Sequence, residues 1–88
     1  MKLYRRMTEA DAFEMDQEWM IMNAEQCTVT KLSESGAVCW ELLKEDQSMS
    51  SLVAGLQEIY DVTEEEAIRD IDSFLTEMIK AGLVQYAS

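Results

Sequence analysis

The two cysteines, Cys27 and Cys39, are the side chains in this 88-residue sequence best suited to covalent or metal chemistry. The sequence contains no histidine, which is the commonest general base near neutral pH and the commonest zinc ligand. The two cysteines are too far apart for a CxxC pair, and a cysteine nucleophile would have no imidazole partner. The sequence also has no glycine-rich phosphate loop. We therefore expect no enzymatic activity, no metal site and no cofactor.

Carboxylates are the other groups that could act as acid and base. They are spread along predicted helix faces, where a solvated surface role is the expected one. This interpretation applies to Glu34, Glu41, Glu45, Glu58, Glu64, Glu65 and Glu77.

The charge balance restricts the class of partner. Eighteen acidic residues against seven basic ones give a net charge of -11 at pH 7. Such a surface repels phosphate backbones and anionic membranes, so we expect neither nucleic acid nor a membrane as partner. A neutral or basic partner would be attracted, although the charge can equally serve solubility alone.

The sequence favours a cytoplasmic protein. It has no apolar run long enough for a bilayer span, and the start MKLYRRMTEADAF lacks a continuous apolar stretch after its basic residues. Two lone thiols are typical of buried small side chains in a reducing compartment, with a Cys27–Cys39 disulfide as the alternative.

The hydrophobic period changes once along the chain, which we interpret as a single domain over residues 1–88. Up to residue 32 the spacing is two, with short runs at 12–15, 19–22 and 27–32 that predict three antiparallel strands. From Ser33 onward the spacing is helical. Ser33, Ser48 and Thr63 are predicted N-caps of three helices within residues 33–82.

The predicted fold class is α+β, with a three-stranded antiparallel sheet followed by a three-helix, winged helix-turn-helix bundle. Gly82 is expected in the left-handed conformation after the last helix. Residues 83–86 are too short for another helix and predict a terminal strand or wing.

The methionines allow two interpretations. Five of them occupy predicted core positions: Met15, Met20, Met22, Met49 and Met78. We expect flexible core fillers, and the alternative is an adaptable apolar binding surface.

A binding groove is suggested by the strand around Thr28 and Thr30, which is polar and alternating, and by the broad apolar face of the last helix. An exposed strand edge beside an apolar groove can accept an added peptide strand. Ile71, Phe74 and Met78 have the helical spacing to line such a groove, with ordinary core packing as the alternative.

About three-quarters of the chain resembles the PqqD-like proteins, which are precursor-peptide recognition elements of ribosomal peptide maturation. The matching stretches are WMI at 19–21, TKLSESGAVCWELL at 30–43, SMSSLVAGL at 48–56, YDV at 60–62, DIDSFL at 70–75 and AGLV at 81–84. Each stretch is degenerate, but their order and spacing are family-like. Ser33 departs from the pattern, because the family often has asparagine there.

The resemblance implies that a leader peptide docks as a fourth strand along the third strand, in the cleft against the third helix. Asp70 or Asp72 would then favour a basic leader residue, with a surface role as the alternative. The peptide-binding residues implied are Cys27, Thr28, Val29, Thr30, Lys31, Asp70, Ile71, Phe74, Leu75 and Met78.

The resemblance also implies partner enzymes. A discrete, acidic domain resembles the recognition proteins of lasso-peptide pathways, which serve a separate leader peptidase and a macrolactam-forming cyclase. The alternative is the chaperone of the pyrroloquinoline quinone pathway, which serves a radical-SAM enzyme. A winged-helix transcriptional regulator is a further alternative, but the acidic third helix would repel DNA phosphates.

Overall fold

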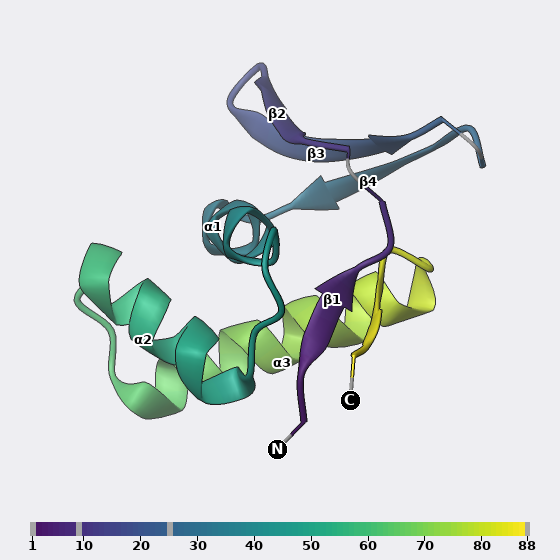
Figure 1. The fold of residues 1–88 in the computed structure, drawn as a ribbon. Helices are drawn as coiled ribbons and strands as arrows, with labels where there is room; N and C mark the ends of the chain where they lie inside the picture. The colour runs from purple at the N-terminus through teal and green to yellow at the C-terminus, as the bar shows by residue number, and fades with distance from the viewer. Residues whose placement is uncertain (1, 9, 25, 88) are drawn as a thin grey trace.

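The structure is a computed structural model that describes residues 2–8, 10–24 and 26–87. The sheet lies on one side of the molecule and α2 and α3 on the other, with α1 between them (Figure 1). In chain order the elements are β1 (Tyr4–Arg6), β2 (Ala12–Met15), β3 (Glu18–Asn23), β4 (Thr28–Leu32), α1 (Glu34–Leu42), α2 (Met49–Ile59), α3 (Glu64–Lys80) and β5 (Val84–Tyr86).

The predicted three-stranded antiparallel sheet is confirmed, with strand order β2-β3-β4. Asp16 and Gln17 connect β2 to β3, and both have positive φ angles of 53° and 67°. This pair of angles is typical of a type I′ turn, which fixes the register of a two-residue hairpin. Met15 therefore pairs with Glu18, and each later pair follows from that one.

The two faces of the sheet differ in their surroundings. Ile21 is fully buried against the helices and pairs with Thr30, so Thr28, Thr30 and Leu32 share its inner face. Met15 and Met22 lie on the outer face, where they are 55% and 54% exposed.

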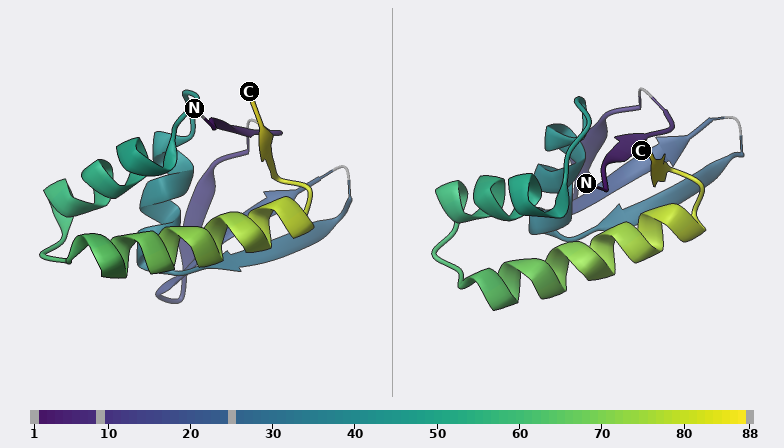
Figure 2. Two further views of the ribbon diagram at one scale, coloured as in Figure 1. Left: turned by 90° about the horizontal axis from the view of Figure 1, so that it is seen from below. Right: turned by 60° about the horizontal axis from the view of Figure 1, so that its bottom comes forward.

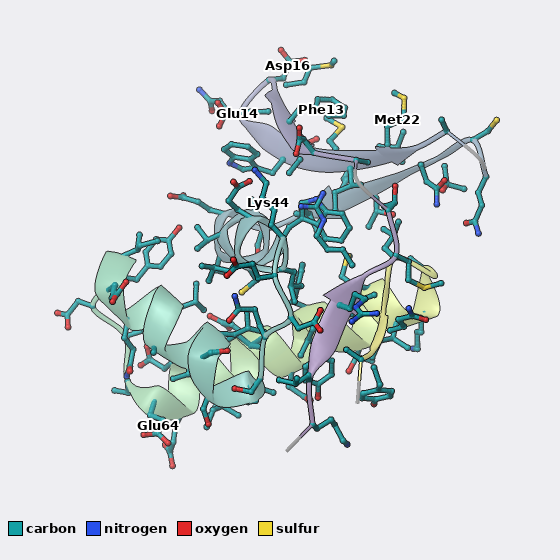
Figure 3. The ribbon with its side chains drawn as sticks, in the orientation of Figure 1. Phe13, Glu14, Asp16, Met22, Lys44 and Glu64 are labelled. Atoms are coloured by element: carbon teal, nitrogen blue, oxygen red, sulfur yellow. The ribbon has the colours of Figure 1, made fainter. Side chains whose placement is uncertain are left out.

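Figure 3 shows Met22 and Phe13 on the side of the sheet away from the helices. The prediction that Met15 and Met22 are core residues is therefore wrong, whereas Met78 is buried as predicted. The β2–β3 hairpin carries apolar residues on both faces, so alternation alone could not choose which face is inside.

The three helices begin at the predicted caps. The Ser33 hydroxyl accepts the backbone N–H of Gly36, and the Thr63 hydroxyl accepts that of Glu66, each at 3.1 Å. Ser48 and Ser51 form a reciprocal capping box at the start of α2. These bonds satisfy amides that have no partner within the helix.

The end of α3 turns the chain back along the molecule. Gly82 has φ of +74°, as predicted, and the N–H groups of Gly82 and Leu83 bond to the carbonyls of Ile79 and Met78. This Schellman motif directs β5 antiparallel to β1, with Tyr4 opposite Tyr86. The sequence predicted a terminal strand but not its partner β1.

Two sets of contacts hold the N-terminal segment against the rest of the protein, one made by Arg5 of β1 and the other by the buried Trp40. Arg5 forms two hydrogen bonds with the Asp46 carboxylate, at 3.0 and 2.9 Å, next to the α1–α2 connection. The Trp40 indole N–H donates to the carbonyl of Ala10 at 2.8 Å, and the Arg6 guanidinium lies 4.2 Å from the centre of the indole ring.

Cys27 is exposed and Cys39 is buried, and both are free thiols, so the alternative of a disulfide between them is wrong. Within residues 2–8, 10–24 and 26–87, no helix combines the length and the apolar character that crossing a membrane requires.

Candidate functional site

The outer edge of β4 is the open edge of the sheet that faces α3. Among the residues that the structure describes, only β3 pairs with β4, and the C-terminal strand β5 belongs to a separate sheet with β1. Figure 2 shows β4 running alongside α3. An edge strand presents a row of backbone donors and acceptors that an additional strand can pair with.

The hairpin register identifies which backbone groups face this edge. Met15 and Glu18 flank a two-residue turn, so they form a hydrogen-bonded pair, and the pairs then alternate along β3. The bonds of β3 to β4 consequently come from pairs such as Ile21–Thr30. It follows that the N–H and C=O groups of Val29 and Lys31 point away from β3, towards the open edge.

A groove of about 370 Å³ lies between the end of β4, the first turn of α1 and the face of α3. Its lining residues are Lys31, Leu32, Ser33, Ser35, Asp70, Ser73, Phe74, Glu77 and Met78. Gly36 allows α1 to approach the groove closely, since a Cβ atom at that position would lie 3.2 Å from Cδ1 of Phe74. Phe74 therefore packs against α1 and also lines the groove.

The ten residues predicted for peptide binding divide into three groups. Lys31, Asp70, Phe74 and Met78 line the groove. Thr28, Val29 and Thr30 lie in β4, and Cys27 precedes it in the turn, so these four follow the open edge without lining the groove.

Ile71 and Leu75 form the third group. They are 0% and 3% exposed and pack in the hydrophobic core, so they do not line the groove. On a helix these two positions are one turn apart and face the protein interior, whereas the groove follows the neighbouring row that contains Asp70, Ser73 and Glu77.

Sequence reasoning missed Leu32, Ser33, Ser35, Ser73 and Glu77 as groove residues. The sequence predicts Ser33 as an N-cap, and in the structure its hydroxyl also lies 3.1 Å from that of Ser35. A signal was present in the helical spacing, because Ser73 and Glu77 border the apolar row of α3 and must lie at the edge of any groove beside it.

The groove carries acidic and basic groups at different places. Asp70 and Glu77 come from α3, and Lys31 comes from β4, where its ammonium group lies 3.5 Å from the Glu18 carboxylate.

Cys39 lies beneath this region, and burial followed by the nearby Asp70 charge raises the pKa of its thiol to about 12. The thiol is therefore protonated near neutral pH and poorly nucleophilic.

The described residues contain no group of three or more histidine, cysteine, aspartate or glutamate side chains arranged to hold a metal ion. What the arrangement offers is backbone pairing along β4 and a partly apolar groove next to it. This combination can hold an extended polypeptide.

Comparison with solved structures shows the same fold in two proteins. One is TbiB1 in complex with the TbiA(beta) leader peptide, with a TM-score of 0.74 and 21% identity over 92% of this chain and 94% of that one. The other is lasso peptide synthetase B1 complexed with the leader peptide, with a TM-score of 0.73 and 20% identity over 93% and 96% of the two chains.

No curated protein sequence matches this chain significantly. A family model does match it, over residues 18–84, and its description is coenzyme PQQ synthesis protein D (PqqD). The matched region runs from the start of β3 to the start of β5, so it contains β4, all three helices and the groove. On this match the chain belongs to the PqqD family.

Proposed function

We propose that this protein binds the leader segment of a ribosomally made precursor peptide as an added strand on β4. The observation that carries the proposal is the open edge of β4 beside a groove formed with α3. Two proteins of the same fold are known in complex with leader peptides, which supports the choice of ligand.

In this proposal, backbone pairing supplies affinity that tolerates different leader sequences. The outward-pointing groups of Val29 and Lys31 offer two donors and two acceptors to the incoming strand. Of the residues from 27 to 31 that the sequence predicted for binding, Val29 and Lys31 act through their backbone groups, whereas those of Thr28 and Thr30 are already bonded to β3.

Selectivity then arises from the groove, because every second side chain of the added strand points towards α3. Phe74, Met78 and Leu32 provide apolar contact for one such side chain. Asp70 and Glu77 favour a basic residue beside it, and the ion pair of Lys31 with Glu18 leaves Lys31 exposed enough to contact an acidic one.

We further propose that the protein acts without catalysis of its own and presents the leader to separate enzymes in the cytoplasm. The enzymes are a leader peptidase and a macrolactam cyclase of a lasso-peptide pathway, or alternatively a radical-SAM enzyme served by a PqqD-type chaperone. The absence of histidine and the free thiols support a binding role in a reducing compartment.

In the same proposal the three helices and the β1–β5 pair correspond to a winged helix-turn-helix that serves as a peptide scaffold. A transcriptional regulator of that type remains the second candidate, because this arrangement also occurs in DNA-binding proteins. The first turn of α3 opposes it, with Glu64, Glu65 and Glu66 exposed in a row.

The test is a titration of the isotopically labelled protein with two ligands. We expect the leader of the precursor encoded nearest to this protein to bind saturably and to shift the amide resonances of residues 27–31 and of α3. Duplex DNA should cause no shift at moderate salt. Saturable, steeply salt-dependent DNA binding without leader binding would favour the regulator instead.

A further inference from the structure

A second pocket, of about 460 Å³, borders α1 at other residues than the groove does. It is bordered by α1, the C-terminal end of α2 and the β2–β3 hairpin. None of its lining residues lines the groove, although Glu34 of the pocket stands in sequence between Ser33 and Ser35 of the groove.

The walls of this pocket are apolar and aromatic. Trp19 from β3 and Tyr60, the C-cap residue of α2, are both half-buried there, and Val38 and Leu42 of α1 contribute aliphatic contacts. Ile59 lies at the border with 60% of its surface exposed, which extends the apolar area beyond the pocket itself. A small free cation would leave this extension uncovered.

The pocket also carries negative charge. Glu34 and Glu41 of α1 both line it. Glu41 is paired with Lys44 at 2.7 Å, whereas Glu34 forms no ion pair with any of the residues that the structure describes.

Other features of the surroundings favour a cation beside Glu34. The α2 helix ends at the pocket without a basic residue in its last turn, so the negative end of its macrodipole has no compensating side chain. Glu34 and Tyr60 line the same pocket, and burial followed by the charge of Glu34 raises the pKa of Tyr60. Glu14 stands opposite Trp19 in the hairpin, on the same face of the sheet.

We infer that this pocket receives an arginine or lysine side chain, next to an apolar residue, from a second polypeptide that binds while the groove holds its own ligand. The cation lies against the aromatic rings of Trp19 and Tyr60 and beside the Glu34 carboxylate. The apolar neighbour covers Ile59. The negative charge of the whole molecule attracts a basic partner to this surface.

Two probes separate charge from shape. Acetyl-leucyl-arginine amide carries the guanidinium, and acetyl-leucyl-citrulline amide has nearly the same shape without the charge. We measure the indole N–H resonance of Trp19, assigned with Trp19→Phe, and use the buried Trp40 as an internal reference. We expect a saturable shift of Trp19 with the arginine probe and at least about fivefold weaker binding of the citrulline probe.

Glu34→Gln should reduce the affinity for the arginine probe to that for citrulline. Its matched control is Glu45→Gln, because Glu45 is exposed after α1 and lines neither site, and this variant should bind as the parent does. Equal binding of the two probes to the parent protein would overturn the inference, as would the absence of any Trp19 shift.

The leader must also be excluded as the occupant. We expect the arginine probe to shift Trp19 equally in protein already saturated with leader peptide. If bound leader blocks the probe, the pocket belongs to the leader and the assignment to a second polypeptide is wrong. Loss of leader binding alone would contradict the proposed function and leave the Trp19 result standing, so the two failures are distinguishable.

Discussion

Phe74 packs in the core and also lines the groove. A substitution that tests leader binding in the groove must therefore be made at another residue. The Phe74 side chain is 9% exposed, and it packs with the buried cluster that includes Ile71 and Leu75. Truncating a buried phenylalanine to alanine costs about 3–5 kcal/mol, a large share of the stability of a small domain. Phe74→Ala would therefore confuse lost binding with lost folding.

Ser73→Trp is the better test of the groove. Ser73 lines the groove but is exposed on α3, so an indole there fills the groove without entering the core. We expect leader affinity to fall by at least about tenfold, measured by calorimetric titration, with an unchanged melting temperature.

Thr76→Trp is the matched control for Ser73→Trp. Thr76 is also exposed on α3 but lies outside the groove, so this variant should bind the leader as the parent does. Equal losses in both variants would remove the groove from the account.

The raised pKa of the Cys39 thiol predicts a specific dependence of stability on pH. This thiol has a pKa of about 12 in the folded protein against an ordinary value of 9.0, mainly because of burial. The unfolded chain thus loses this proton near pH 9 while the folded chain keeps it. The free energy of unfolding should fall between pH 9 and 12, by at most about 1.4 kcal/mol per pH unit from this group.

Urea unfolding at several pH values measures this effect as a difference between the parent and Cys39→Ala. The variant lacks the group and should lose less stability over the same range. Cys27→Ala keeps Cys39 and should follow the parent. Parallel curves for the parent and Cys39→Ala would show that the folded protein does not hold the Cys39 proton.

At the scale of elements, local signals in the sequence were enough to predict β2, β3, β4 and the three helices. The caps at Ser33, Ser48 and Thr63 and the glycine at 82 each act within a few residues, so they can be read without knowing the tertiary structure. β1 could not be predicted, because its three residues form a strand only through β5, at the other end of the chain.

The candidate site was predicted in outline, and its details depended on packing. Helical spacing identified α3 as one wall, but it could not tell which row of the helix meets the core. The spacing therefore predicts Ile71 in the groove and the family resemblance implies Leu75, although both are buried. The groove runs along the row of α3 beside these core residues, and Gly36 allows α1 to come close to Phe74 there.

Val29→Pro tests the strand edge as an element. The N–H of Val29 faces the open edge, so proline there should preserve pairing with β3, as prolines at sheet edges do. One donor to the added strand is lost and the ring obstructs its approach. We expect leader affinity to fall about tenfold, since one hydrogen bond contributes about 0.5–1.5 kcal/mol before the steric effect.

The control for Val29→Pro is Val29→Thr, which keeps the N–H and the branched side chain. Backbone chemical shifts of β3 should show that the sheet is intact in both variants. Unchanged leader affinity in the proline variant, with the sheet retained, would mean that the ligand does not pair along β4.

At the scale of the whole molecule, the two candidate sites both border α1 but share no lining residue. The groove uses the edge of β4 and α3, and the second pocket uses the hairpin and the end of α2. A net charge of -11 surrounds both, so basic ligands are attracted from a distance and raised salt should slow their association.

Amide hydrogen exchange along β4, with and without leader peptide, tests the central claim most directly. In the free protein, the amides of Thr28, Thr30 and Leu32 should already exchange slowly because they bond to β3. The amides of Val29 and Lys31 should exchange quickly. Addition of leader should slow exchange at Val29 and Lys31 and leave the other three nearly unchanged. Leader binding that leaves Val29 and Lys31 exchanging as fast as before would contradict strand addition at this edge.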